Sequence, residues 1–139
     1  MDNLQIVREY IEEVENKGKI DQSDKYLTPH FQIHSLHLNP KPVGDTQPKT
    51  YKEALQQSQE ALSNSHKTIN DIFMQGDKVV VLWTTEAINT GKFMGNPPTN
   101  KKVTYSGMTI FRLENGKIAE YWYVWDRLGL YQQLGIIKS

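Results

Sequence analysis

The feature that most constrains the fold is a β-favouring run near the C-terminus that ends in a single carboxylate. Residues 117–125 read Lys-Ile-Ala-Glu-Tyr-Trp-Tyr-Val-Trp, and such aromatic and β-branched residues are typical of a largely buried strand. Asp126 follows at once, and Leu128, Leu130 and Leu134 then suit a short helix. A carboxylate beside so many apolar side chains must be hydrogen-bonded, paired or protonated. Asp126 is therefore either a helix cap or an acid/base group tuned by apolar surroundings.

Size and composition narrow the class of protein. A chain of 139 residues predicts one domain, residues 1–139, able to bury well over half of its extended-chain surface. Lys plus Arg equals Asp plus Glu at 16 each, so no overall field attracts nucleic acid or an anionic membrane. The absence of cysteine excludes disulfides, thiolate metal sites and cysteine nucleophiles. Neither a signal peptide nor a membrane-spanning run is expected, and the predicted location is the cytoplasm.

Three helices are predicted in the first half of the chain. Apolar residues recur at helical spacing between Asn3 and Lys17, with Asp2 as the N-cap and Gly18 just after the last turn. A shorter helix is predicted from Asp21 to just before Thr28. A third helix is predicted at about Lys49–Asn64.

The rest of the chain predicts strands. The predicted strands are His30–Leu38, His66–Gln75, Lys78–Asn89, Lys101–Leu113 and Lys117–Asp126. Short glycine-containing turns at 75–77 and 114–116 favour hairpins between them, and the prolines of residues 40–48 predict an irregular loop. Helices followed by sequential strands indicate an α+β fold with a strongly curved antiparallel sheet. The helices would cover one face and leave a concavity between.

This order of elements resembles the nuclear-transport-factor-2-like superfamily and, within it, the SnoaL-like polyketide cyclase (ester cyclase) family. The segments that carry the resemblance are Gly95–Val103, Gly107–Phe111, Gly116–Trp122 and Val124–Gly135. The resemblance implies a cone-shaped α+β barrel of the cystatin-like type, with N-terminal helices packed on the curved sheet. It also implies that the aspartate of the terminal strand is the acid/base of an intramolecular aldol ring closure without cofactor or metal.

Asp126 falls on the position of that aspartate. The well-described cyclases also carry a histidine on the preceding long strand, whereas residues 101–113 contain none, and the nearest histidine by motif is His34. Asp126 also suits the N-cap of the following helix, and the two roles are compatible because a helix N-terminus orients a carboxylate.

Strand alternation groups the candidate side chains by face. It places Gln32 and His34 together with His30 and opposite Phe31 and Ile33, and leaves open which group faces the concavity. The prediction is that His34 orients or protonates a substrate beside Gln32. A metal site made by the histidines at 30, 34 and 37 is not expected, because their spacing suits a helix rather than a strand.

The aromatic residues are expected to form the substrate pocket and a subunit interface. Residues 122, 124 and 126 share one strand face, so Trp122 is expected to line the cavity together with Asp126. Trp83 and Tyr105 are assigned to the same pocket. The opposite face, with Tyr121, Tyr123 and Trp125, is expected to pack on neighbours or on a second subunit, which predicts a homodimer through the sheet.

The resulting hypothesis is a SnoaL-like enzyme that acts on a small, largely apolar or aromatic carbonyl compound. Asp126 would remove a proton beside the carbonyl and later protonate the new alkoxide, while His34 or Gln32 holds the enolate oxygen. Aldol-type cyclisation, isomerisation or hydrolysis would use the same pocket. The alternative is a non-catalytic module for small-molecule binding or dimerisation, and the missing histidine on the long strand favours it.

Overall fold

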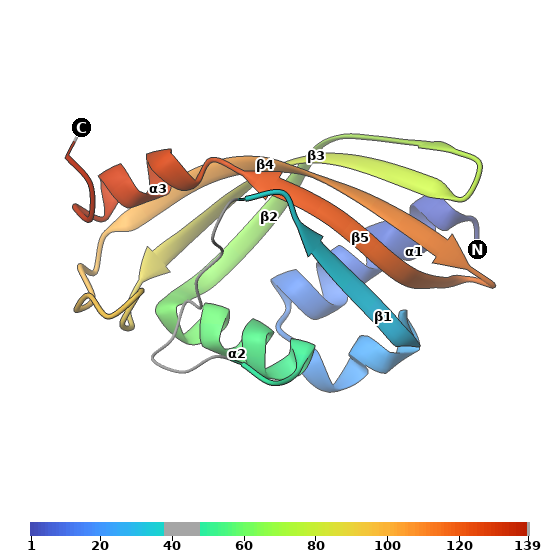
Figure 1. Ribbon diagram of the computed structural model, residues 1–139, viewed down its shortest axis with the longest axis horizontal. Coiled ribbons are helices and arrows are strands. Elements are labelled where there is room, and N and C mark those ends of the chain that lie inside the picture. The colour runs from blue at the N-terminus through green and yellow to red at the C-terminus, as the bar shows by residue number, and fades with distance from the viewer. Residues whose placement is uncertain (38–47, 139) are drawn as a thin grey trace.

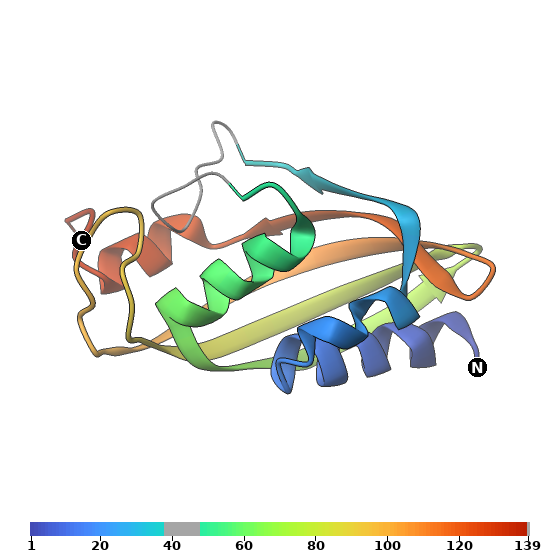
Figure 2. The ribbon, with the colours of Figure 1, turned by 90° about the horizontal axis from the view of Figure 1, so that it is seen from below.

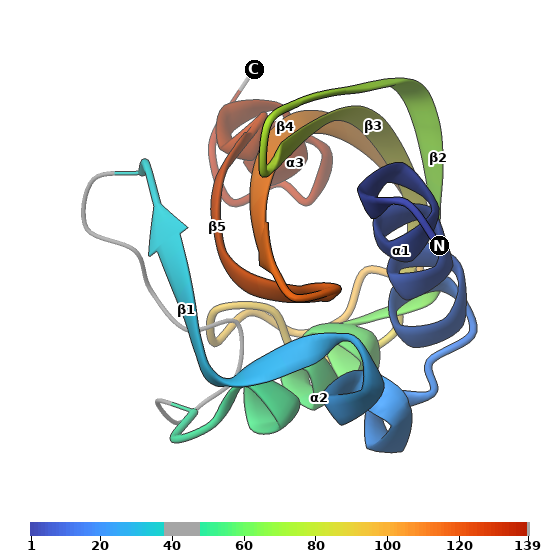
Figure 3. The ribbon, with the colours of Figure 1, turned by 90° about the vertical axis from the view of Figure 1, so that its right-hand side faces the viewer.

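The fold is a curved five-stranded sheet with helices against its concave face (Figures 1 and 3). The computed structural model describes residues 1–37 and 48–138. The helices are α1 (Asn3–Tyr10), the π-helix η1 (Ile11–Asn16), the 3₁₀ helix η2 (Ile20–Lys25), α2 (Tyr51–Ala61) and α3 (Arg127–Gln133). The strands are β1 (Leu27–Ser35), β2 (Leu62–Gln75), β3 (Lys78–Asn89), β4 (Lys102–Glu114) and β5 (Lys117–Trp125). Within the described ranges, no helix has the length and apolarity to cross a membrane.

The sheet is mixed rather than wholly antiparallel. Its order is β1-β5-β4-β3-β2, and β2 to β5 form the antiparallel meander that the sequence predicts. The prediction was wrong for β1, which runs parallel to β5. Leu27 pairs with Ile118, so both strands start at the same end of the sheet. As an edge strand, β1 tolerates Pro29, which lies where its register with β5 shifts.

The first helix follows the predicted range but changes pitch. Asp2, the expected N-cap, forms a capping box with Gln5 through bonds of 2.8 and 3.3 Å. From Ile11 the α-helix continues as the π-helix η1, a form often found at functional sites. Gly18 then adopts a φ of +70°, a left-handed conformation that glycine reaches without a Cβ clash.

Several other predicted boundaries shift, including the start of β2, which lies at Leu62 rather than at His66. Helix α2 ends at Ala61 rather than at Asn64, because Leu62 already begins β2. Strand β1 begins at Leu27, earlier than predicted. Most of the predicted proline loop lies outside the described residues.

The core is divided into two apolar clusters on the concave side. The larger cluster packs α1 and η1 against β3, β4 and β5, and the smaller joins the end of α2, the 91–96 segment and α3. Figure 2 shows α1 and α2 along the same side of the sheet. The sheet curves around the side where the helices lie (Figure 3), and side chains of its middle strands line an interior space.

Candidate active site

An interior cavity of ≈ 330 Å³ lies between the concave sheet face and the helices. Its aromatic wall consists of Tyr51, Trp83, Phe93, Tyr105, Phe111, Tyr121, Tyr123, Trp125 and Tyr131. Neighbouring rings touch: the Trp83 and Tyr105 centroids are 6.0 Å apart, and those of Tyr105 and Trp125 are 5.3 Å apart. The volume and lining suit a small planar, largely apolar ligand.

Strand β5 presents the opposite face to the cavity from the one predicted. Tyr121, Tyr123 and Trp125 line the cavity, and Tyr121 packs on neighbouring rings of the same chain, one of the two environments expected for this group. The Tyr121 ring lies 5.3 Å from the Phe31 ring and from the Phe111 ring. These contacts fix the orientation of the strand, since a two-residue period is satisfied equally by either face.

The predicted residues Gln32, His34 and Trp122 therefore lie away from the cavity. His34 stacks on Trp122 at 5.2 Å, and its Nε2 lies 2.7 Å from an oxygen of Glu120. Gln32 is exposed. Trp83 and Tyr105 do lie in the cavity wall, and their contact with a substrate stays a prediction.

Asp126 is an exposed helix cap. Its Oδ1 accepts a hydrogen bond of 2.9 Å from the Gly129 backbone N–H. The side chain borders an open depression on the outer sheet face, formed mainly by Leu82, Met108 and Val124, and is absent from the lining of the interior cavity. The expected position of this carboxylate in a desolvated interior was thus wrong, because the neighbouring rings turn inward while Asp126 turns outward.

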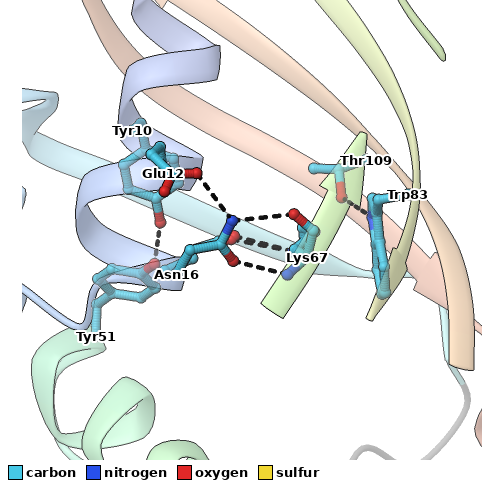
Figure 4. A network of polar contacts seen from close by, with 8 residues as sticks. Tyr10, Glu12, Asn16, Tyr51, Lys67, Trp83 and Thr109 are labelled. Atoms are coloured by element: carbon cyan, nitrogen blue, oxygen red, sulfur yellow. Dashed lines mark hydrogen bonds and ion pairs between the residues drawn. The ribbon is translucent and has the colours of Figure 1, made fainter. Parts of the chain in front are cut away.

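One end of the interior cavity holds an ion pair. The Lys67 ammonium lies 2.9 and 3.0 Å from the two Glu15 oxygens, and the side chains are only 19 and 16 % exposed. The same ammonium lies 4.2 Å from the Trp83 ring centroid, a favourable cation–π geometry. The Trp83 indole N–H donates to Thr109 Oγ1 at 3.0 Å (Figure 4).

Asn16 holds this end of the cavity in place. Its Oδ1 accepts from the Lys67 backbone N–H at 2.7 Å, and its Nδ2 donates to the Lys67 carbonyl at 3.0 Å (Figure 4). The pair of bonds satisfies backbone groups of β2, which is an edge strand of the sheet. η1 and β2 are therefore locked at the position of the Glu15–Lys67 ion pair.

Phenol groups surround the Glu15 carboxylate. Tyr10, fully buried, shares a hydrogen bond with the Tyr51 hydroxyl (Figure 4). Burial raises the pKa of Tyr51 above its usual value, the Glu15 charge raises it further, and the hydroxyls of Tyr10 and Tyr121 act in the opposite sense. Burial followed by the Glu15 charge also raises the pKa of Tyr105, to about 12. These phenols therefore remain protonated at neutral pH and serve as hydrogen-bond donors.

A histidine lies next to Trp125, on the far side of the Trp83, Tyr105 and Trp125 rings from Lys67. His37 is partly buried, and its Nε2 accepts a 3.2 Å hydrogen bond from the Trp125 backbone N–H. Burial first, and the Arg127 charge second, lower the pKa of His37. A neutral ring that accepts at Nε2 carries its proton on Nδ1, so His37 offers a neutral N–H donor.

Sequence reasoning missed Glu15, Lys67 and His37. Glu15 comes four residues after the buried Ile11, at the edge of the apolar helical stripe, and that spacing is the signal that could have found it. Lys67 shares strand alternation with Ile69 in the same way. Nothing in the sequence near His37 indicates burial. Within residues 1–37 and 48–138, no three His, Asp or Glu side chains converge as a metal site would require.

Comparison with known proteins gives a consistent result. A family profile described as SnoaL-like polyketide cyclase matches residues 5–134. A candidate polyketide cyclase from Acidithiobacillus ferrooxidans is 29% identical, with a TM-score of 0.80 over 95% of this chain and 93% of that one. AclR, a candidate hydroxylase from Streptomyces galilaeus, is 20% identical, with a TM-score of 0.82 over 97% and 82% of the two chains.

A third similar structure is wild-type IdmH, a candidate polyketide cyclase from Streptomyces antibioticus. It is 23% identical, with a TM-score of 0.76 over 96% of this chain and 99% of that one. At such identities AclR and IdmH support the fold alone. No curated protein matches the sequence significantly.

Proposed function

The chain belongs to the SnoaL-like polyketide cyclase family, and we propose that it is an enzyme that moves protons on a small, aromatic or otherwise apolar carbonyl compound bound in the interior cavity. The observation that carries this proposal is the cavity itself. Its wall is aromatic, while Glu15, Lys67, His37 and Arg127 add charged or titratable groups to the lining. Such a site holds a planar apolar ligand and places a few oriented polar side chains next to the ligand's polar atoms.

The proposed chemistry is an aldol-type ring closure or a related proton transfer. A base removes a proton from the carbon beside one carbonyl, and the resulting enolate carbon attacks a second carbonyl of the same molecule. The alkoxide that forms then takes up a proton. A positioned base contributes about 10²–10⁴ in rate, and low-polarity surroundings strengthen hydrogen bonds to the enolate oxygen.

Asp126 retains a predicted role that one substitution tests. Asp126→Asn keeps a capping oxygen for the Gly129 N–H, since Asn and Asp cap helices about equally well, but removes the acid/base group. Loss of turnover in a folded Asp126→Asn protein would assign the proton transfer to Asp126. Retention of turnover would assign it to a group that lines the cavity.

Binding in the interior cavity is tested with 2-tetralone, a small aromatic ketone. Trp83 and Trp125 line the cavity and Trp122 lies outside it, so ligand binding should quench tryptophan fluorescence equally in wild type and Trp122→Phe. Ser58→Phe, on the cavity side of α2, should abolish quenching. Gln56→Phe, on the exposed side of the same helix, is the matched control. Equal quenching in both α2 variants would refute the proposed binding site.

A non-catalytic binding module remains the second candidate. It is favoured by the engagement of Asp126 as a cap and of Glu15 with Lys67. The discriminating measurement is exchange of the protons beside the carbonyl of 2-tetralone in D₂O, followed by NMR. Binding without any acceleration of exchange would support the module rather than the enzyme.

We also infer a homodimer through the outer face of the sheet. Leu82, Met108 and Val124 are register neighbours across β3, β4 and β5 and are 37, 44 and 38 % exposed. A continuous exposed apolar stripe of this kind is typical of an interface. Met108→Glu should shift the sedimentation coefficient from dimer to monomer, and a monomeric wild type would contradict the inference.

The predicted cytoplasmic location rests on the absence of cysteine and is tested by cell fractionation.

A further inference from the structure

The groups at the ion-pair end of the cavity are arranged for enolate formation. We propose that Glu15 is the proton-exchanging base and that the Tyr51 hydroxyl is the donor that holds the enolate oxygen. This inference rests on the proposed function and assigns its chemistry to two residues. It also gives a substrate class, an aromatic ketone with an acidic C–H beside the carbonyl and a second hydrogen-bond acceptor further along the molecule.

Glu15 is the carboxylate that lines the interior cavity among the described residues. Two sets of contacts fix its position. The Lys67 ammonium contacts both Glu15 oxygens, and the neighbouring Asn16 ties η1 to the backbone of Lys67. Each carboxylate oxygen keeps a further lone pair beyond its bond to Lys67. A carboxylate can serve as the base in this chemistry, as an Asp does in ketosteroid isomerase.

Tyr51 has a hydroxyl proton available for a ligand. Tyr10 is fully buried and its described hydroxyl partner is Tyr51. Because a buried phenol O–H must find an acceptor, Tyr10 donates to Tyr51. The Tyr121 hydroxyl is the second partner of Tyr51 and donates to its other lone pair, so the Tyr51 proton is left for an acceptor in the cavity. A hydroxyl that accepts a hydrogen bond becomes a stronger donor through mutual polarisation. Burial and the nearby Glu15 charge keep the pKa of Tyr51 high, so the group donates without ionising.

The proposed reaction balances in protons and electrons without any further reagent. The Glu15 carboxylate takes the proton, the C–H electron pair becomes the C=C bond, and the carbonyl π pair moves to the oxygen that Tyr51 holds. In ring closure the enolate carbon then bonds to the second carbonyl carbon. The alkoxide formed there takes up a proton from water, and the Glu15 carboxylic acid returns its proton to water.

His37 is the proposed partner of the second hydrogen-bond acceptor of the substrate. Ring contacts run in series from Trp83, which Lys67 faces, through Tyr105 to Trp125, and the His37 ring lies 5.5 Å from the Trp125 ring. A neutral imidazole can polarise a carbonyl as an electrophile. The substrate is therefore expected to span the wall, with one oxygen at Tyr51 and the other at His37.

The test measures deuterium exchange at the carbon beside the carbonyl of 2-tetralone, at pD values from about 5 to 9, which bracket the ordinary range of a working acid/base group. Glu15→Gln should lower the exchange rate by about 10²–10⁴, and Tyr51→Phe by about 10¹–10³, within the range for one lost oxyanion donor. Glu86→Gln, an exposed carboxylate on β3 outside the cavity lining, and Tyr26→Phe, a buried phenol outside the cavity lining, are the matched controls. Glu15→Asp keeps the charge and should retain part of the rate, which guards against a Gln variant that fails to fold.

The affinity for 2-tetralone, measured by fluorescence quenching, distinguishes a failure of the Glu15 and Tyr51 assignment from a failure of the proposed function. Unchanged binding with lost exchange in Glu15→Gln supports the assignment. Exchange retained in Glu15→Gln but lost in Asp126→Asn overturns the assignment and leaves the proposed function intact. A folded wild type that binds tetralone without accelerating its exchange overturns the assignment and the catalytic proposal, and failure to bind overturns the proposed site as well.

Discussion

Removing the Lys67 charge tests whether the ion pair lies in a poorly solvated cavity. Lys67→Met keeps the aliphatic stem but leaves the Glu15 carboxylate without a cation. Breaking a fully buried pair costs about 3–5 kcal/mol, whereas an exposed pair contributes about 0–1 kcal/mol. With both side chains less than one fifth exposed, and with the contact to the Trp83 ring lost as well, we expect the free energy of unfolding to fall by about 2–3 kcal/mol.

Urea denaturation followed by circular dichroism at pH 7 measures this loss, which corresponds to a fall in Tm of about 5–10 °C. The matched control is Lys17→Met. Its ammonium lies 3.1 Å from Glu13, but Lys17 is 49 % exposed, so the loss should stay below about 0.5 kcal/mol. In the double variant with Glu15→Gln, part of the stability should return, because no unpaired charge remains. A Lys67→Met protein as stable as Lys17→Met would refute the reasoning.

Three further predictions concern the cap, a close contact and a titrating group. Asp126→Ala should lower the free energy of unfolding by about 1 kcal/mol, while Asp126→Asn should change it by less than about 0.5 kcal/mol; equal losses in urea denaturation would contradict the capping role. Gly107→Ala would place a Cβ against the Trp83 ring and 2.6 Å from the Val124 carbonyl oxygen, so it should cost about 1–3 kcal/mol in the same assay, and an unchanged midpoint would contradict the packing. Because the pKa of His37 is lowered in the folded protein, the unfolded chain binds more protons below about pH 6.5. Stability should therefore fall as pH drops from 7 to 5, and His37→Gln should flatten that slope; an unchanged slope would place the neutral histidine in doubt.

Local signals in the sequence were sufficient for most of the fold. Strand β3 has the predicted bounds, and Asp2 caps α1 through Gln5 as predicted. These features depend on residues close together in the chain. The parallel pairing of β1 with β5 depends on two segments some ninety positions apart, as in Leu27 with Ile118, and no local pattern encodes it.

The site was harder to predict for two physical reasons. Alternation in β5 separates Tyr121 from Trp122 but cannot say which of them faces inward, and contacts with Phe31 and Phe111 decide it. Glu15 lies on a π-helix whose extra residue per turn changes the direction of its side chain. Asp126 was correctly recognised as a possible cap, but its exposure follows from the direction in which the whole strand faces.

The most direct test of the account locates a bound aromatic ligand. A crystal of the protein soaked with 6-bromo-2-naphthol would give an anomalous bromine peak that fixes the ring position. We predict a peak inside the cavity, between the ion-pair end and Trp125, with the naphthol oxygen at the Tyr51 hydroxyl. A peak in the outer depression beside Met108 and Val124, near Asp126, would contradict the central claim that the interior cavity is the functional site.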